Sequence, residues 1–184
     1  MEIIIFDTET TGLLKPSANE LSAQPYITEL YALKVRQYDS RRFDIIGEYE
    51  QMFKVPVKLD EVIVRITGIT DKMLANKPTF NDCFSDVSKF FLGAERMVAH
   101  NLPFDRSMMA NEMLRCDKVL NFPWPRQHVC TVEKSMAIEQ RRMNLQKLHT
   151  ELMGKPFEEA HRAKNDVMAL YDCYQQMVIK GMII

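Results

Sequence analysis

The sequence predicts an α/β fold in which a mixed β-sheet carries helices on its faces. The chain begins with a short, fully apolar run at 3–6, which is typical of a strand buried on both sides. Two strand-like segments follow at 26–35 and 43–55, and turn-forming residues at 39–42 separate them. Helical and strand-like patterns then alternate to the end of the chain, as expected when helices pack on a sheet.

The first three strands are expected to pair as an antiparallel meander, because consecutive strands joined by a short turn pair in that way. Apolar residues at helical spacing predict helices in the second half of the chain. The remaining expected elements are two short helical segments joined by a turn over 59–74, a helix over 81–92, a strand over 96–100, a helix from Pro103, a loop over 121–125, a strand over 128–131, and helices over 132–138, 144–153 and 162–180.

Length and composition indicate one globular domain over residues 1–184. The chain is 46% hydrophobic and 27% charged, with a net charge of −1, which argues against a strong grip on duplex nucleic acid. No apolar run approaches the roughly 20 residues that a membrane helix needs, and the acidic start excludes a signal peptide. The absence of a long apolar run predicts no membrane partner. The four cysteines show no C-x-x-C spacing, so we expect reduced thiols and a cytoplasmic location.

Two carboxylates follow the first apolar strand. Side chains alternate along a strand, so Asp7 and Glu9 are expected on the same face, where they repel each other. A divalent cation would remove this repulsion, and oxygen ligands favour a hard ion such as Mg²⁺ or Mn²⁺. The alternative is a pair of solvated acids at a strand end.

A second motif lies where the strand over 96–100 meets the next helix. Asp105 falls in the first helical turn, where a carboxylate suits the helix dipole whether or not it binds a metal. His100 and Asn101 have the alternative role of loop residues that satisfy backbone groups. Phe104 has the alternative role of a core residue.

A third motif precedes and opens the last helix. Asp166 lies at the edge of the apolar face of that helix, where an unpaired carboxylate is costly. His161 is five residues earlier, so it is expected in the lead-in loop, where it could act as a general base or be an ordinary surface histidine. Four carboxylates and one histidine at the ends of neighbouring elements fit two-metal phosphodiester hydrolysis.

These motifs resemble those of the DnaQ-like DEDDh 3′–5′ exonucleases, which have a ribonuclease H-like fold. The resemblance covers the chain in the family's order through segment 6–12, then His100, Asn101, Phe104 and Asp105, then His161 with Asp166; segment 66–71 also resembles a family segment near the nucleotide pocket. It implies a five-stranded mixed sheet, three strands antiparallel and two parallel, flanked by helices.

The resemblance also implies roles for individual residues. Asp7, Glu9, Asp105 and Asp166 would hold two divalent ions, Mg²⁺ or Mn²⁺, and His161 would be the general base. The implied contacts to the terminal nucleotide come from Thr10, Thr11, Gly12 and Leu13, with Leu13 against the base, and less strongly from Asn101 and Phe104.

The expected activity is removal of nucleoside 5′-monophosphates from single-stranded 3′ ends, with DNA favoured over RNA. Proofreading, repair or end processing would be the setting, and a DNA polymerase is a candidate partner. RNA trimming or degradation of short oligoribonucleotides is a second interpretation, and a non-catalytic module that binds nucleic acid or a polymerase is a third. Arg141, Arg142 and Lys147, or Arg41 and Arg42, could guide the strand or lie on solvated faces.

Overall fold

Five strands form one mixed sheet, with the order β3-β2-β1-β4-β5, in the computed structural model of the protein, which describes residues 1–17, 20–158 and 162–184. Pairing is antiparallel between β1 and β2 and between β2 and β3, and parallel between β1 and β4 and between β4 and β5. This arrangement confirms the predicted sheet of three antiparallel strands and two parallel ones. The strands are β1 Glu2–Thr10, β2 Ile27–Gln37, β3 Phe43–Met52, β4 Arg96–Ala99 and β5 Gln127–Cys130.

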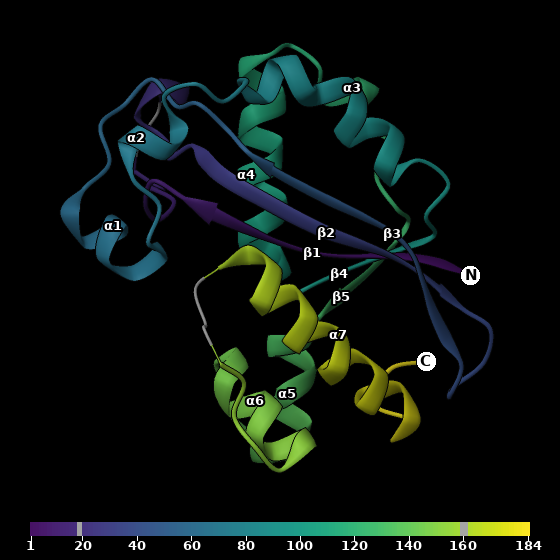
Figure 1. Cartoon of the computed structure of the whole chain (residues 1–184). Helices are drawn as coiled ribbons and strands as arrows, with labels where there is room; N and C mark the ends of the chain where they lie inside the picture. The colour runs from purple at the N-terminus through teal and green to yellow at the C-terminus, as the bar shows by residue number, and fades with distance from the viewer. Residues whose placement is uncertain (18–19, 159–161) are drawn as a thin grey trace.

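Helices cover both faces of the sheet (Figure 1). One face carries α3 and α4, the other carries α7 with α5 and α6 beside it, and α1 and α2 lie near the carboxyl end of β1. The helices in the described part of the chain are α1 Glu61–Thr67, α2 Asp71–Leu74, α3 Phe80–Phe91, α4 Leu102–Arg115, α5 Thr131–Glu139, α6 Leu145–Met153 and α7 Ala163–Ile179.

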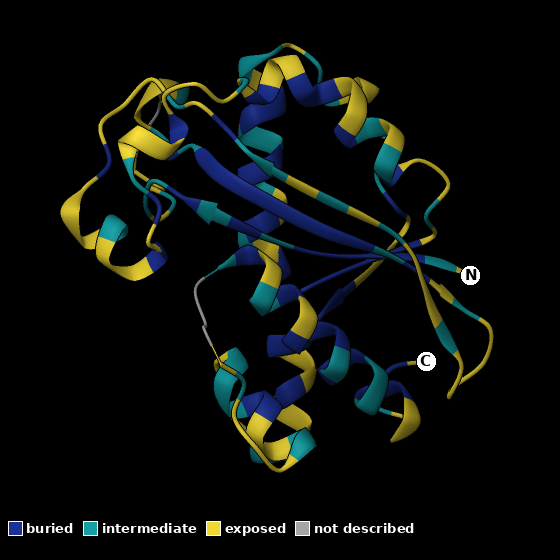
Figure 2. Cartoon of the chain, viewed as in Figure 1, coloured by how far each residue is buried: buried dark blue, intermediate teal, exposed yellow. Residues whose placement is uncertain are grey.

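Strand β1 lies in the middle of the sheet and separates two hydrophobic cores (Figure 2). Ile4 and Phe6 point into the core beneath α3 and α4, whereas Ile3 and Ile5 point into the core beneath α7. All four side chains are completely buried, which confirms that the apolar run is a central strand. Alternation therefore decides which core each later residue of β1 faces.

Local signals define the helix ends. Thr79 and Asp82 form a capping box that begins α3, and the Asn144 side chain accepts from the Lys147 backbone N–H at the start of α6. Gly68 follows α1 with φ of 71°, a left-handed conformation that glycine adopts without strain. These caps set the residues at which α3 and α6 begin and the residue at which α1 ends.

Several boundaries differ from those expected, and the largest difference is that β1 runs from Glu2 to Thr10 and so includes Asp7 and Glu9. β3 ends at Met52 rather than at residue 55, because the Lys54 N–H donates to Pro78 O and Pro56 has no N–H to continue the ladder. Thr131 begins α5 instead of ending β5. Two unpredicted 3-10 turns occur at Leu21–Ala23 and Val119–Asn121. None of the helices in the described ranges is long and apolar enough to cross a membrane.

Candidate active site

Two acidic residues continue β1 on the face that α7 covers. Asp7 and Glu9 follow the alternation of Ile3 and Ile5, so their side chains leave the α7 core and reach the carboxyl end of the strand. Carboxylate oxygens of Asp7, Glu9 and Asp166 lie within 4.8 Å of one another. The strand and helix thus bring together three of the four acids that the sequence motifs singled out.

Helix α7 places Asp166 beside the strand. Asp166 lies in the first turn, and its N–H donates to Arg162 O at 3.0 Å. The buried face of α7, including Val167 and Leu170, packs in the same core as Ile5. Because this packing fixes the helix against the sheet, the position of Asp166 relative to Asp7 follows from the core.

Asp105 approaches from the opposite face of the sheet. It lies in the first turn of α4, is 2% exposed, and its Oδ1 accepts from Thr8 N at 3.1 Å and from Thr8 Oγ1 at 2.8 Å. Asp105 is not among the three mutually close acids, but its negative charge raises the pKa of Asp7. Thr8 therefore ties Asp105 to the strand that carries Asp7 and Glu9.

Burial and mutual repulsion keep these acids from ionising easily. Burial, followed by the charges of Asp105 and Glu9, raises the pKa of Asp7 well above its ordinary value. Burial, followed by the charges of Asp166 and Glu29, raises the pKa of Glu9 to about 7. Burial also raises the pKa of Asp105 to about 7, although both Thr8 hydrogen bonds oppose the shift.

The donor set fits a hard divalent cation. Across the described residues, no lysine or arginine forms an ion pair with Asp7, Glu9 or Asp105. The available ligands are carboxylate oxygens, which Mg²⁺ and Mn²⁺ prefer. A bound cation would stabilise the charged forms of Asp7, Glu9 and Asp105, whose raised pKa values show that burial outweighs the protein groups that oppose it.

A cavity of about 300 Å³ opens beside the acids. Its lining consists of Asp7, His100, Asn144, Leu145, Gln146, Phe157 and Asp166. His100 bonds through Nδ1 to Thr131 Oγ1 at 2.9 Å and through Nε2 to Met143 O at 3.1 Å. Burial lowers the pKa of His100 to about 4, so it is neutral at pH 7. Its hydrogen bonds join the start of α5 to the backbone at Met143, as expected from its alternative role of satisfying backbone groups.

His161 lies outside the described residues. Its predicted role as general base therefore stays a prediction from the sequence.

The segment predicted to hold the terminal nucleotide follows β1. Thr10 Oγ1 donates to Gly12 O at 2.7 Å, and Thr11 exchanges hydrogen bonds with the Tyr26 backbone. Leu13 is 79% exposed, so an apolar side chain projects from this turn into solvent. These positions are compatible with nucleotide contacts, and the contacts themselves stay predictions.

Two weaker candidates differ in their surroundings. Asn101 is exposed at the start of α4 with φ of 77°, and Phe104 is half-buried against the core beneath α3 and α4. Phe104 thus has the core contact that was its alternative role.

Some of the basic residues considered as strand guides have local partners. Arg141 and Lys147 both pair with Glu139, and Arg42 lies 4.4 Å from the centre of the Tyr38 ring. These contacts support a solvated, ion-paired face around Glu139 and a solvated hairpin face at Arg42.

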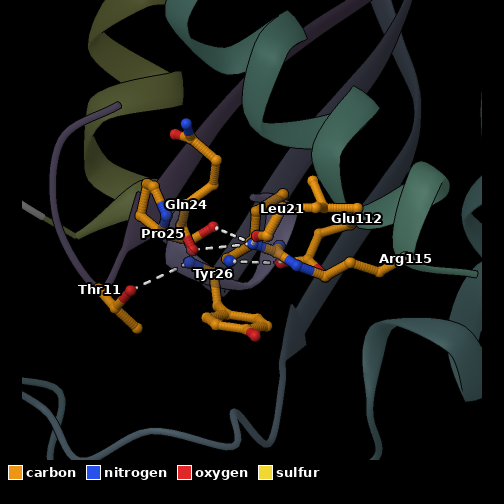
Figure 3. Close-up of polar contacts among 8 residues, drawn as sticks. Thr11, Leu21, Gln24, Pro25, Tyr26, Glu112 and Arg115 are labelled. Carbon is orange, nitrogen blue, oxygen red and sulfur yellow. Dashed lines mark hydrogen bonds and ion pairs between the residues drawn. The ribbon is translucent and has the colours of Figure 1, made fainter. Parts of the chain in front are cut away.

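Sequence reasoning missed two buried glutamates. Glu29 is 2% exposed in β2 and pairs with Arg162, and Glu112 is 5% exposed in α4 and pairs with Arg115 (Figure 3). A charged residue inside the apolar segment 27–35 was an available signal for Glu29. Glu112 had no comparable signal, because its helix carries polar residues throughout.

Comparisons with known proteins show the family of this chain. The exonuclease family RNase_T matches residues 4–174. The DNA polymerase III subunit epsilon of Treponema pallidum is 30% identical over 177 residues, which cover 94% of this chain and 74% of that protein. A Mycobacterium tuberculosis protein named for exonuclease and endonuclease functions is 29% identical over 180 residues; these cover 95% of this chain and about a quarter, 26%, of that protein.

The fold also matches solved exonuclease structures. The nuclease domain of 3′hExo, described as a DEDDh family member bound to rAMP, superposes with a TM-score of 0.73 at 13% identity, covering 98% of this chain and 92% of that chain. Exonucleases of this type generally depend on divalent metals, in keeping with the acidic group described above. The chain therefore belongs to the RNase_T exonuclease family, as a hydrolytic, DnaQ-like 3′–5′ exonuclease domain.

Proposed function

We propose that residues 1–184 form one domain that removes nucleoside 5′-monophosphates from single-stranded 3′ ends, with DNA as the preferred substrate. The observation that carries the proposal is the group of three carboxylates, Asp7, Glu9 and Asp166, whose oxygens lie within 4.8 Å of one another. Asp105 on α4 completes the acidic set, because its hydrogen bonds with Thr8 hold it against β1.

The four acids would hold two divalent ions, Mg²⁺ or Mn²⁺. When bound, such ions lower the pKa of an attacking water and stabilise charge on the leaving oxygen. Thr8 keeps Asp105 turned toward β1, and the α7 core keeps Asp166 beside Asp7. His161 would accept the proton of the attacking water.

The preference for DNA is supported by relatives and by charge. The Treponema pallidum relative is a DNA polymerase III subunit, which also supports a DNA polymerase as partner and a role in proofreading or repair. The net charge of −1 favours single-stranded ends, where few phosphates are contacted. RNA trimming is the second candidate, because a structure with the same fold holds rAMP.

The test is a digestion of 5′-labelled single-stranded DNA and RNA of matched sequence with Mg²⁺, Mn²⁺ or EDTA. We expect a metal-dependent ladder of 3′-shortened products, stronger on DNA. Asp7→Asn should abolish the ladder, and His161→Ala should lower turnover about 10²–10⁴-fold.

The matched control is Asp86→Asn, which changes an exposed acid on α3 whose one ion pair among the described residues is with exposed Lys89. It should cleave like the unmodified protein. A ladder that persists in EDTA, or in Asp7→Asn, would contradict the assigned site, and a stronger ladder on RNA would make RNA the substrate.

A further inference from the structure

Glu29 lies directly opposite Glu9 in the sheet. The two residues are register partners in the antiparallel pair of β1 and β2, so their side chains leave the same face. Glu29 is 2% exposed. Like charges directly across a strand pair destabilise a sheet, so a buried glutamate at this position requires a compensating group.

Arg162 is the compensating group. Its Nη2 lies 3.0 Å from Glu29 Oε1, and the Ala163 N–H donates to Glu29 Oε2 at 3.3 Å. Arg162 occupies the N-cap position of α7, where its own side chain makes no capping hydrogen bond. Glu29 therefore caps the first turn of α7 from another element, where a negative charge also suits the helix dipole.

The same arginine lies close enough to Glu9 to act on it. Glu9 and Glu29 are register partners whose side chains leave the same face, and the Arg162 guanidinium is bound to Glu29, so the guanidinium lies on the Glu9 side of the sheet. Register opposes Glu9 to Glu29, so an Arg162 released from Glu29 has Glu9 as a neighbouring acceptor. An arginine paired with Glu9 would compete with a cation for the same oxygens.

We propose that Glu29 is a positioning residue, which holds Arg162 away from Glu9 and fixes the start of α7 so that Glu9 and Asp166 can face a divalent cation. This inference rests on the proposed function, because it concerns the same metal-binding acids. Outer partners of metal ligands commonly change metal affinity about 10–100-fold.

The test measures Mn²⁺ affinity by calorimetry at about pH 8, well above the ordinary range in which carboxyl groups titrate. Glu29→Gln keeps an oxygen that can accept from Ala163 N–H but no longer binds Arg162 as an ion pair. We expect its Mn²⁺ affinity to fall about tenfold. Arg162→Gln, which removes the competitor instead, should bind Mn²⁺ no more weakly than the unmodified protein.

The double variant Glu29→Gln with Arg162→Gln decides between positioning and simple loss of structure. It should regain an affinity within about threefold of the unmodified protein, because no arginine is left to occupy Glu9. It also keeps the test available if Glu29→Gln alone folds poorly. Glu112→Gln is the matched control, because it breaks the other buried Glu–Arg pair and should leave Mn²⁺ affinity unchanged.

Three results would overturn the inference, and they are distinguishable. If the unmodified protein and Asp7→Asn bind Mn²⁺ equally, the metal site is wrong, and the proposed function fails together with the inference. If the unmodified protein binds Mn²⁺ through Asp7 but Glu29→Gln binds it equally well, only the inference fails. A double variant as weak as Glu29→Gln also contradicts it, because Arg162 would then not be the competitor.

Discussion

Glu112 is a buried glutamate and Glu9 a half-buried one, and the charges around them differ. Glu112 on α4 has Arg115 at 2.8 Å and accepts from the Ile27 backbone N–H at 2.9 Å. Glu9 at the end of β1 has carboxylate oxygens of Asp7 and Asp166 within 4.8 Å and forms no ion pair with a described lysine or arginine. Glu112 has an arginine partner within the fold, whereas Glu9 is surrounded by like charges.

The Glu112 region shows what an internal partner achieves. Nη2 of Arg115 donates to the carbonyl oxygens of Leu21, Gln24 and Pro25, and its guanidinium lies 3.7 Å from the centre of the Tyr26 ring (Figure 3). The pair thus joins α4 to the chain that leads into β2. At Glu112 burial raises the pKa of the carboxyl while the Ile27 N–H and Arg115 oppose the shift, whereas at Glu9 the neighbouring acids add to the effect of burial until a proton or a cation binds.

Breaking the Glu112 pair should have the largest effect on stability. Glu112→Gln leaves the largely buried Arg115 without its anion, and we expect a loss of about 3 kcal/mol in the free energy of unfolding. Urea denaturation with and without Mn²⁺ measures it. The double change Glu112→Leu with Arg115→Met should recover part of the loss, and a loss below about 0.5 kcal/mol would show that the pair is not structural.

Neutralising Glu9 should raise the free energy of unfolding of the metal-free protein, whereas breaking the Glu112 pair lowers it. Because its folded pKa of about 7 exceeds the unfolded value near 4.5, the stability it contributes is complete below about pH 4.5 and is lost as pH rises through 7. Glu9→Gln should therefore raise the metal-free free energy of unfolding by about 1–3 kcal/mol at pH 8 and leave it unchanged near pH 4.5.

The measurement is the difference in urea denaturation between the two proteins in EDTA at several pH values. His100 works in the other direction, because its pKa falls from 6.5 to about 4 and its contribution is lost as pH falls through that range. It is present in both proteins and cancels in the difference. A Glu9→Gln protein that is less stable at pH 8 would remove the contrast with Glu112.

Removing one hydroxyl should have the smallest effect. Thr8→Val deletes the Oγ1 donor to Asp105 but keeps the backbone donor, so we expect Mn²⁺ affinity to fall about fivefold, equivalent to about 1 kcal/mol. Ser107→Ala is the control, because it removes a hydroxyl that donates to Pro103 O on α4, the helix that carries Asp105. It should leave Mn²⁺ affinity unchanged. Equal affinities of Thr8→Val and the unmodified protein would mean that Thr8 does not position Asp105.

Periodicity predicted the parts of the fold and site that depend on neighbours in sequence. An apolar run predicted the central strand, and the two-residue repeat predicted that Asp7 and Glu9 share a face. The first-turn position of Asp105 in α4 also followed from the sequence. These features need only the geometry of one element.

The rest depended on which elements meet. The Thr8–Asp105 hydrogen bonds span 97 positions, and the Arg162–Glu29 pair spans 133. No local pattern states that α4 approaches β1 from one face while α7 approaches from the other. Glu29 was missed for this reason, since its meaning depends on the register with Glu9 and on the helix that lies above it.

The position of β1 between two cores has a consequence for when the acidic set is assembled during folding. Asp105 comes from the helix layer on one face, and Asp166 comes from the helix layer on the other. A nascent or damaged chain that has assembled only one layer cannot present the whole acidic set. On the proposed function, an incomplete domain is therefore inert toward nucleic acid, and cleavage begins only when folding is finished.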